Sequence, residues 1–427
     1  MHARRIAPFV ASACLALLWI SLAGGLAAQS TAEDFALRDG DRVVFYGDSI
    51  TDQRRYTSFV ESFVVTRFPD LDVSFVHSGW GGDRVAGGGG GPIDVRIWRD
   101  ILPYDPTVVT IMLGMNDGGY RAFDPERFDT YSSGYEHIVD TLRRQLPGVR
   151  ITAIQPSAYD DVTREPGFPG GYNSVLVQYS EFLEELAEES GLGLADLNTP
   201  LVATLEAARS IDAENAARLI PDRVHPGTEV ALVMAGALLG SWNAPGIVSE
   251  VEIDAGRMQV AVENNATVSD LNRGQGIAWT QLDRALPMAV RPDNALMNLV
   301  LESSDFIETF NRQPLRVSGL AEGRYLLRID GEEIGSFTAA ELSSGLNLAV
   351  LTTPMVRQAA DVHDLTLEHA AVHNTRWRQL QVPFQTNNSP ELLAAMTSLD
   401  AFEAMLIRRQ RDAARPQAHR FEVVPEP

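Results

Sequence analysis

Four short polar segments each follow a run of apolar residues, and together they carry the groups needed for acyl transfer. Gly47-Asp48-Ser49 offers a serine hydroxyl as a nucleophile, and Asp222-Arg223-Val224-His225 offers an imidazole three residues from a carboxylate. At that spacing the carboxylate can fix the imidazole tautomer, and the imidazole can then accept the serine proton. Each segment alone also has a structural explanation, a helix N-cap for the first and a surface turn for the second.

Two further segments offer hydrogen-bond donors for a developing oxyanion. Gly114-Met115-Asn116-Asp117 contains the side-chain amide of Asn116. Trp80-Gly81-Gly82 contains glycines, which let a backbone N–H such as that of Gly82 approach a ligand closely. An Asx turn and a plain loop are the structural alternatives. Trp80 and Asp48 are candidate substrate contacts, the indole either as a stacking surface for a sugar or as a wall of the cleft.

The elements around these segments predict how they are positioned. Short apolar runs typical of buried strands alternate with stretches of helical periodicity. The expected strands cover residues 43–46, 73–76, 108–113, 149–154 and 193–197, and the main helices cover 56–68, 128–146, 172–190 and 228–242. This alternation predicts an α/β fold with a parallel sheet covered on both faces. The polar segments follow strands one, two, three and five, so they are expected to meet at one edge of the sheet.

In this order the segments resemble the sequence blocks of the SGNH/GDSL hydrolase family. The first block is Gly47-Asp48-Ser49-Ile50, with isoleucine where the family name has leucine, and the second matches best at Gly82. The third block, G-x-N-D, is Gly114-Met115-Asn116-Asp117, and the fifth, D-x-x-H-P, runs from Asp222 to Pro226. One departure is His77, where many members carry asparagine.

The resemblance extends over residues 42–242 and implies both a fold and a mechanism. The implied fold is a flavodoxin-like three-layer α/β/α sandwich with a parallel sheet. The implied mechanism uses Ser49 as the nucleophile, His225 as the base and Asp222 as the acid that orients it, with no metal and no cofactor. The implied oxyanion hole consists of the backbone N–H groups of Ser49 and Gly82 and the side-chain amide of Asn116.

Four parts are expected along the chain of 427 residues. They are a signal peptide over residues 1–28, the hydrolase domain over 29–245, a β-rich accessory region over 246–358, and a helical C-terminal segment over 359–427 that ends in a polar tail from residue 415. Alternation with period two at 248–262 and 315–329, followed by the hairpin signal Asp330-Gly331, predicts the β-rich region. Helical periodicity over 359–380 and 390–412 predicts the helices of the last part.

The first residues predict export. A basic start at Arg4 and Arg5 precedes an apolar run over residues 6–22, and the small residues at 23–28 resemble a signal-peptidase site. A membrane anchor is the alternative, although the run is short for a span, which needs about 20 residues. We expect a secreted or periplasmic protein without stable membrane insertion. The mature part lacks thiols, because the single cysteine, Cys14, lies in the leader.

The net charge of −22 restricts the partners of the protein. The chain contains no lysine, so its 35 basic residues are all arginine, against 57 acidic residues. Such a surface repels nucleic acid and anionic membranes, and neither is expected as a partner. Salt adaptation and a GC-rich genome both explain this composition. His363, His369 and His373 share one predicted helix and are expected to form a polar face rather than a metal site.

The expected substrate is a small-molecule or glycan ester with a short acyl group, in particular an O-acetyl group on a carbohydrate. Export, the acidic surface and the added β-rich region favour it. A lipase or lysophospholipase is the first alternative, but the glycine run at residues 87–91 offers no apolar lid. A non-catalytic carbohydrate-binding protein on the same fold is the second alternative, and the complete catalytic set argues against it.

Overall fold

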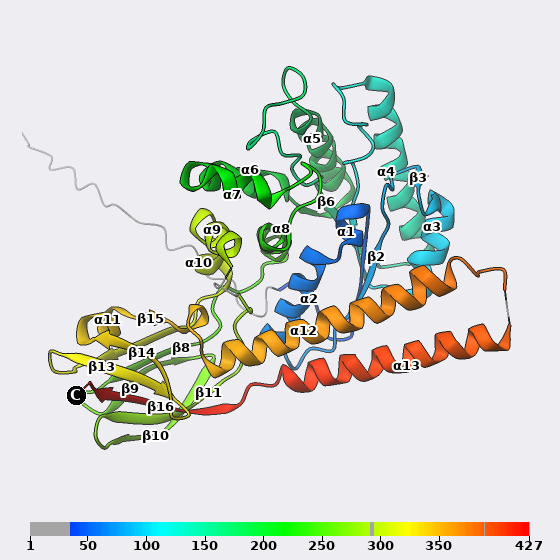
Figure 1. Cartoon of the computed structure of the whole chain (residues 1–427). Helices are drawn as coiled ribbons and strands as arrows, with labels where there is room; N and C mark the ends of the chain where they lie inside the picture. The colour runs from blue at the N-terminus through cyan, green and yellow to red at the C-terminus, as the bar shows by residue number, and fades with distance from the viewer. Residues whose placement is uncertain (1–34, 291–293, 388, 427) are drawn as a thin grey trace, which may run out of the picture.

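Figure 1 shows the computed structural model of the chain, which describes residues 35–290, 294–387 and 389–426. The expected signal peptide, residues 1–28 with Cys14, lies outside these ranges. None of the helices within them is long and apolar enough to cross a membrane. The described residues form two hydrophobic cores, one around a parallel sheet and one inside the C-terminal β-rich region.

The first core surrounds a five-stranded parallel sheet with the strand order β2-β1-β5-β6-β7. Its strands are β1 Arg42–Gly47, β2 Ser74–Gly79, β5 Val108–Met112, β6 Arg150–Ile154 and β7 Gly193–Ala195. The run Val43-Val44-Phe45-Tyr46 in β1 is completely buried, as expected for a strand covered on both faces. The strands expected from the apolar runs are confirmed, and so is the flavodoxin-like sandwich.

Helices cover both faces of this sheet (Figure 1). α2 and α8 contact each other on one face, and α3, α4 and α5 follow one another on the other. The helices of the domain are α2 Arg55–Arg67, α3 Ile93–Asp100, α4 Pro125–Gln145, α5 Asn173–Ser190, α6 Asn198–Ile211, α7 Ala213–Leu219 and α8 Thr228–Ser241. Local signals set their ends: Asp124 caps α4 by accepting from the Glu126 N–H, and α5 ends at Gly191 with a left-handed φ of 60°.

The C-terminal β-rich region contains two sheets (Figure 1). One has the order β10-β11-β16-β13-β14 and the other β15-β12-β8-β9. Their strands are β8 Glu250–Asp254, β9 Gln259–Asn264, β10 Ala266–Arg273, β11 Ile277–Asp283, β12 Pro314–Ser318, β13 Arg324–Ile329, β14 Glu332–Thr338, β15 Leu346–Asn347 and β16 Ala418–Pro425. In their shared core Trp279 stacks on Phe421, with ring centroids 5.3 Å apart. The expected β-rich region is confirmed.

Strand β16 contradicts the polar tail expected from residue 415. It is the central strand of the five-stranded sheet and pairs antiparallel with β11 and β13. His419, Phe421 and Val423 are buried, while Arg420 and Glu422 between them are only half-buried. The prediction was wrong because charged residues at alternate positions concealed an apolar pattern of period two.

The β-rich region also contains helices that the alternation did not predict. α9 Ala295–Ser303 and α10 Phe306–Phe310 lie between β11 and β12 in the chain and pack against the hydrolase domain. α9 contacts α6, α7 and α8, and α10 contacts α8. A short helix, α11 Ala339–Ser344, packs on β12. Residues 246–358 therefore contribute to both cores.

Two long helices extend from the β-rich region along the hydrolase domain. α12 Pro354–Asn374 lies along α2, and α13 Pro390–Ala413 runs back beside α12 (Figure 1). They confirm the helices expected in the C-terminal segment, and we call the pair the helical hairpin. α12 continues into a π-helical stretch, Thr375–Gln381, and α13 is followed closely by β16. The chain thus leaves the β-rich region, follows the hydrolase domain and returns to the β-rich region.

A buried glutamate, Glu61 on α2, holds the helical hairpin against the hydrolase domain. Its carboxylate accepts hydrogen bonds from His369 Nε2 at 2.5 Å, Gln410 Nε2 at 2.9 Å and His77 Nε2 at 3.1 Å. Burial by itself would raise the pKa of Glu61, but the attraction and hydrogen bonds of the two histidines outweigh it and hold the pKa well below its usual range. The glutamate is therefore ionised and paired with an element more than 300 residues away in the chain.

The histidines of α12 are partners in this cluster. Burial lowers the pKa of His369, but the neighbouring carboxylates raise it to about 10. Glu403 lies 3.4 Å from His373 Nδ1, and despite its burial the hydrogen bonds with the histidines lower its pKa to about 2. His363 Nδ1 lies 2.9 Å from Ser62 Oγ. The expected polar helix face is therefore packed against protein, and among the described residues no set of acidic, histidine or cysteine side chains is grouped to hold a metal.

We expect the free energy of unfolding to depend on pH through the ionised groups of this cluster. The contribution of His369 is complete below its usual pKa of 6.5 and is lost as the pH rises toward about 10. The contributions of Glu61 and Glu403 are complete above their usual pKa of 4.5 and are lost as the pH falls. The cluster therefore stabilises the fold most between pH 4.5 and 6.5.

Glu61→Gln removes the nearer of the two carboxylates that pair with the buried His369 and is expected to lower the free energy of unfolding by about 3–5 kcal/mol. The measurement is the unfolding temperature of wild type minus that of the variant across the pH range. The difference is expected to be largest near pH 5–6 and to shrink on both sides. Glu391→Gln, an exposed change on α13, is the control. A difference that does not vary with pH would show that the pairing is not electrostatic.

Candidate active site

Ser49 is the first residue of α1 (Ser49–Asp52), the short helix that follows β1. Asp48 caps this helix by accepting a hydrogen bond from the Ile50 N–H at 3.0 Å, and it is only 1% exposed. Burial raises the pKa of Asp48 to about 7. The expectation that Asp48 contacts substrate is wrong, because its side chain is enclosed and supports the turn that presents Ser49.

Asp222, His225 and Ser49 form a continuous hydrogen-bonded chain. His225 Nε2 lies 2.8 Å from Ser49 Oγ, and His225 Nδ1 lies 2.6 Å from Asp222 Oδ2. The other carboxylate oxygen of Asp222 accepts the backbone N–H groups of Val224 at 3.0 Å and His225 at 2.8 Å. Partial burial raises the pKa of Asp222, but the hydrogen bonds from His225 and Val224 outweigh it and lower the pKa. An ionised Asp222 can therefore orient the imidazole and stabilise its protonated form.

The loop that carries His225 is fastened to its neighbours by backbone contacts. Arg223 has a left-handed φ of 72°, and its carbonyl accepts the Asp160 N–H at 2.9 Å. Arg164, on the same neighbouring segment, donates to the carbonyls of Ala217, Ile220 and Pro221. These residues were not found by sequence reasoning, because arginine contacts to carbonyl groups leave no spacing signal. They fix the loop that carries His225, while the two ring nitrogens of His225 remain bonded to Ser49 and Asp222.

The candidate oxyanion donors lie beside Ser49. The loop after β2 approaches the end of β1 through the Trp80 N–H, which donates to the Gly47 carbonyl at 3.0 Å. In this loop Gly82 is exposed and has a φ of +76°, a conformation that suits glycine. Asn116 Nδ2 donates to the carbonyl of Asp83, the residue after Gly82, at 3.0 Å. These contacts hold the loop of Gly82 against the end of the strand that precedes Ser49, and the Asn116 amide against the residue after Gly82.

Residues 45–231 match the GDSL-like Lipase/Acylhydrolase family. This domain belongs to that family. The match contains all four sequence blocks and the hydrogen-bonded chain from Ser49 to Asp222. The protein is accordingly a carboxylic ester hydrolase, and the expected family and enzyme class are confirmed. No curated protein matches the chain.

Among solved structures, a gut microbial diltiazem-metabolizing enzyme is similar along nearly the whole chain. The two are 25% identical, with a TM-score of 0.81, and the alignment covers 93% of this chain and 100% of that one. An acetyl-xylooligosaccharide esterase from Geobacillus Stearmophilus is 23% identical over 49% of this chain and 96% of its own, with a TM-score of 0.38. An acetyl xylan esterase is 19% identical over 47% of this chain and 98% of its own, with a TM-score of 0.37. The β-rich region and helical hairpin are thus shared with the first enzyme.

Trp80 of the GDSL domain is not a stacking surface for substrate. Only 8% of it is exposed. The guanidinium carbon of Arg378 lies 3.0 Å from the centroid of its ring, and Trp377 contacts it edge to face at 5.6 Å. The expectation of a sugar-stacking Trp80 is therefore wrong, because a π-helical turn at the end of α12 covers the indole. The indole acts as packing behind the loop of Gly82.

Sequence reasoning missed Tyr120, which lies at the mouth of the GDSL site. Its hydroxyl donates to Asn116 Oδ1 at 2.8 Å, and its ring lies against Tyr172 with centroids 5.0 Å apart. Tyr120 is 44% exposed and has a left-handed φ of 58°. A strained residue beside a candidate oxyanion donor is consistent with a functional position. A tyrosine after two glycines carries no chemical signature in the sequence, so only the fold identifies it.

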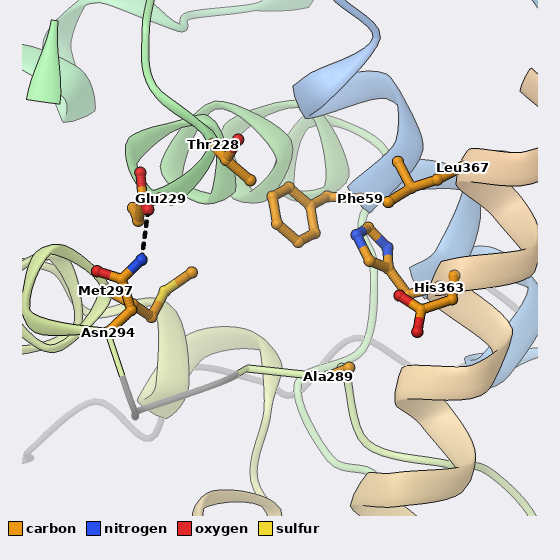
Figure 2. Close-up of a pocket in the computed structure, with 9 residues that line it drawn as sticks. Phe59, Thr228, Glu229, Ala289, Asn294, Met297, His363 and Leu367 are labelled. Carbon is orange, nitrogen blue, oxygen red and sulfur yellow. Dashed lines mark hydrogen bonds between the residues drawn. The ribbon is translucent and has the colours of Figure 1, made fainter. Parts of the chain in front are cut away.

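A cavity of about 410 Å³ lies beside the start of α8, where the GDSL domain, α9 and α12 meet (Figure 2). Its described lining includes Phe59 from α2, Thr228 from α8, Met297 from α9 and Leu367 from α12. At its rim Glu229 accepts a hydrogen bond from Asn294 at 2.7 Å. The volume is in the range of sites for small organic groups. Thr228 is the first residue of α8 and lies three residues after His225 in the chain.

Tyr120→Phe removes the hydroxyl that orients the Asn116 amide and keeps the ring. We expect kcat to fall about tenfold with KM little changed, a smaller loss than the roughly 10²–10³-fold typical of deleting an oxyanion donor itself. Steady-state kinetics on an acetyl ester provide the measurement. Tyr325→Phe, in the β-rich region, is the control and should behave as wild type. An unchanged kcat in Tyr120→Phe would mean that the hydroxyl does not orient Asn116.

Proposed function

We propose that this GDSL protein is a secreted serine esterase that uses Ser49 as nucleophile, His225 as general base and Asp222 as the orienting acid. One observation carries the assignment. The hydroxyl of Ser49 lies 2.8 Å from the imidazole of His225, whose other nitrogen lies 2.6 Å from Asp222. This is the geometry needed to deprotonate a hydroxyl as it attacks a carbonyl.

The reaction proceeds in two halves. His225 accepts the Ser49 proton as Oγ bonds to the ester carbonyl carbon, and the carbonyl oxygen becomes an oxyanion. His225 then gives the proton to the leaving alcohol as the ester C–O bond breaks, which leaves an acyl group on Ser49. Water attacks this acyl-enzyme with His225 again as base, and the acid departs as Ser49 recovers its proton.

The oxyanion is stabilised by donors that are in place before the substrate arrives. These donors are the backbone N–H groups of Ser49 and Gly82 and the second amide hydrogen of Asn116, whose first hydrogen is used by the Asp83 carbonyl. Tyr120 fixes the amide from its oxygen side. Donors held in this way stabilise the transition state without reorganising during the reaction.

We propose that the substrates carry a short acyl group, first of all O-acetyl groups on carbohydrates. The loop after Gly82 supports this. Its glycines form two-residue strands, β3 Gly87–Gly88 and β4 Gly91–Pro92, which pair as a small hairpin. A loop of this composition has no side chains with which to bury a fatty chain, and each buried methylene contributes about 0.8 kcal/mol. Secretion rests on the leader expected at residues 1–28.

A small organic ester is the second candidate substrate. The likeness to a diltiazem-metabolizing enzyme over 93% of this chain supports it, because it includes the parts outside the GDSL domain. The carbohydrate ester and the small organic ester differ in their alcohol, and both carry a short acyl group.

We expect kcat/KM to fall along the series acetyl, butyryl, octanoyl and palmitoyl when the alcohol is held constant. The physical reason is the absence of apolar cover in the loop of residues 87–91. The same assay with acetylated oligosaccharides and with acetylated aromatic alcohols separates the two candidate alcohols. A value that rises to octanoyl or beyond would replace both with a lipolytic enzyme.

Ser49→Ala is expected to abolish ester hydrolysis and covalent labelling by a fluorophosphonate, because both need the nucleophilic oxygen. Its circular dichroism spectrum should match that of wild type, since Ser49 is only half-buried and its hydroxyl bonds to His225. Ser133→Ala, an exposed change on α4, is the control and should keep both properties. Substantial activity in a folded Ser49→Ala protein would refute the assignment.

A further inference from the structure

The π-helical stretch Thr375–Gln381 brings two residues of the helical hairpin against the loop of the GDSL domain that carries Gly82. Trp377 is completely buried, and its indole N–H donates to Asp100 Oδ1 at 2.6 Å. The guanidinium carbon of Arg378 lies 3.0 Å from the centroid of the Trp80 ring. Neither contact is needed to join α12 to α2, which the Glu61 cluster already does. π-helical turns are often found at functional sites.

A buried ion cluster links these contacts to the loop. Arg96, completely buried, forms ion pairs with Asp83 at 2.5 Å and with Asp100. Its guanidinium carbon lies 5.3 Å from the ring of Trp80 and 5.9 Å from that of Trp377. Asp100 therefore accepts from Arg96 and Trp377, and Arg99 donates to it as well, so the carboxylate links the π-helical stretch to the ion cluster.

The same cluster contacts Asp83, which lies next to one candidate oxyanion donor in the chain and bonds to the other. Asp83 directly follows Gly82, and its carboxylate also accepts the Gly90 N–H at 3.0 Å. Its carbonyl accepts Asn116 Nδ2 at 3.0 Å. A movement of Asp83 therefore shifts the Gly82 N–H and the Asn116 amide together. Donors of this kind lose their effect over displacements of a few tenths of an ångström.

Resting on the serine-esterase function proposed above, we infer that Trp377 and Arg378 are positioning residues that hold Gly82 and Asn116 in the oxyanion hole. Trp377 keeps Asp100, and through Arg96 also Asp83, in place. Arg378 clamps Trp80 two residues before Gly82. The helical hairpin thereby completes a site whose reacting groups all lie in the GDSL domain, and neither residue touches the substrate.

Trp377→Phe removes the donor to Asp100 and keeps an aromatic ring, and Arg378→Ala removes the clamp on Trp80. Gln379→Ala, an exposed neighbour, is the matched control. Each variant is labelled to completion with a fluorophosphonate, which counts the molecules that have a reactive Ser49. The value of kcat is then expressed per labelled molecule, so unfolded protein does not lower it. KM and the inhibition constant of a boronic acid, which forms a tetrahedral adduct with the serine, are measured beside it.

We expect kcat per labelled site to fall about 10–100-fold in Trp377→Phe and Arg378→Ala, with KM within about twofold of wild type. The boronic acid is expected to bind more weakly by a similar factor, because its adduct uses the same donors. Arg378→Lys should restore only part of the loss, since an ammonium does not stack flat on an indole. Gln379→Ala should match wild type.

Two results would overturn the inference. An unchanged kcat per labelled site would mean that the two residues act on folding alone. A raised KM with unchanged kcat would mean that they contact the substrate directly. Both are distinct from failure of the serine-esterase assignment, in which Ser49→Ala would remain active and wild type would not be labelled.

Discussion

Strands β1, β2 and β5 end at the same level of the parallel sheet, and the positions of Ser49, Gly82 and Asn116 depend on that register. Gly47 at the end of β1 pairs with Gly79 in β2 and with Met112 in β5. The turn into α1 packs directly on this edge: a Cβ on Gly79 would lie 2.1 Å from the backbone nitrogen of Asp52. Because no side chain fits there, Ser49 leaves the sheet within reach of the loops that follow the two neighbouring strands.

Buried charge fixes the helical hairpin on the GDSL domain at two places. At one end Glu61 is enclosed by histidines of β2 and α12 and by a glutamine of α13. Near the active site Arg96 is enclosed by Asp83, Asp100 and two indole rings. Ion pairs of this kind add little net stability, but breaking one is costly, so they select one arrangement over alternatives. An apolar contact would allow the hairpin to slide, and the loop of Gly82 would move with it.

The candidate reacting residues were predictable because the residues next to each of them in the chain form a recognisable pattern. Ser49, Asn116 and His225 lie in short polar segments after apolar runs, and the order of these segments is enough to place them at one edge of a sheet. Their supporting residues were not predictable. Tyr120, Asp83 and the arginines that bond to carbonyls act through single contacts whose partners are far away in the chain, and such contacts leave no spacing or periodicity in the sequence.

The sequence by itself determined the parallel sheet, the two long C-terminal helices, the β-rich region and the residues of the candidate triad, because periodicity and spacing are properties of adjacent residues. Only the tertiary structure decided that Asp48 and Trp80 are buried, that residues 418–425 form a central strand, and that the histidines of α12 face protein. In each case burial is set by a distant partner: Glu61 and His369 are 308 residues apart. A side chain's solvent exposure is a property of the assembled fold, and no local pattern encodes it.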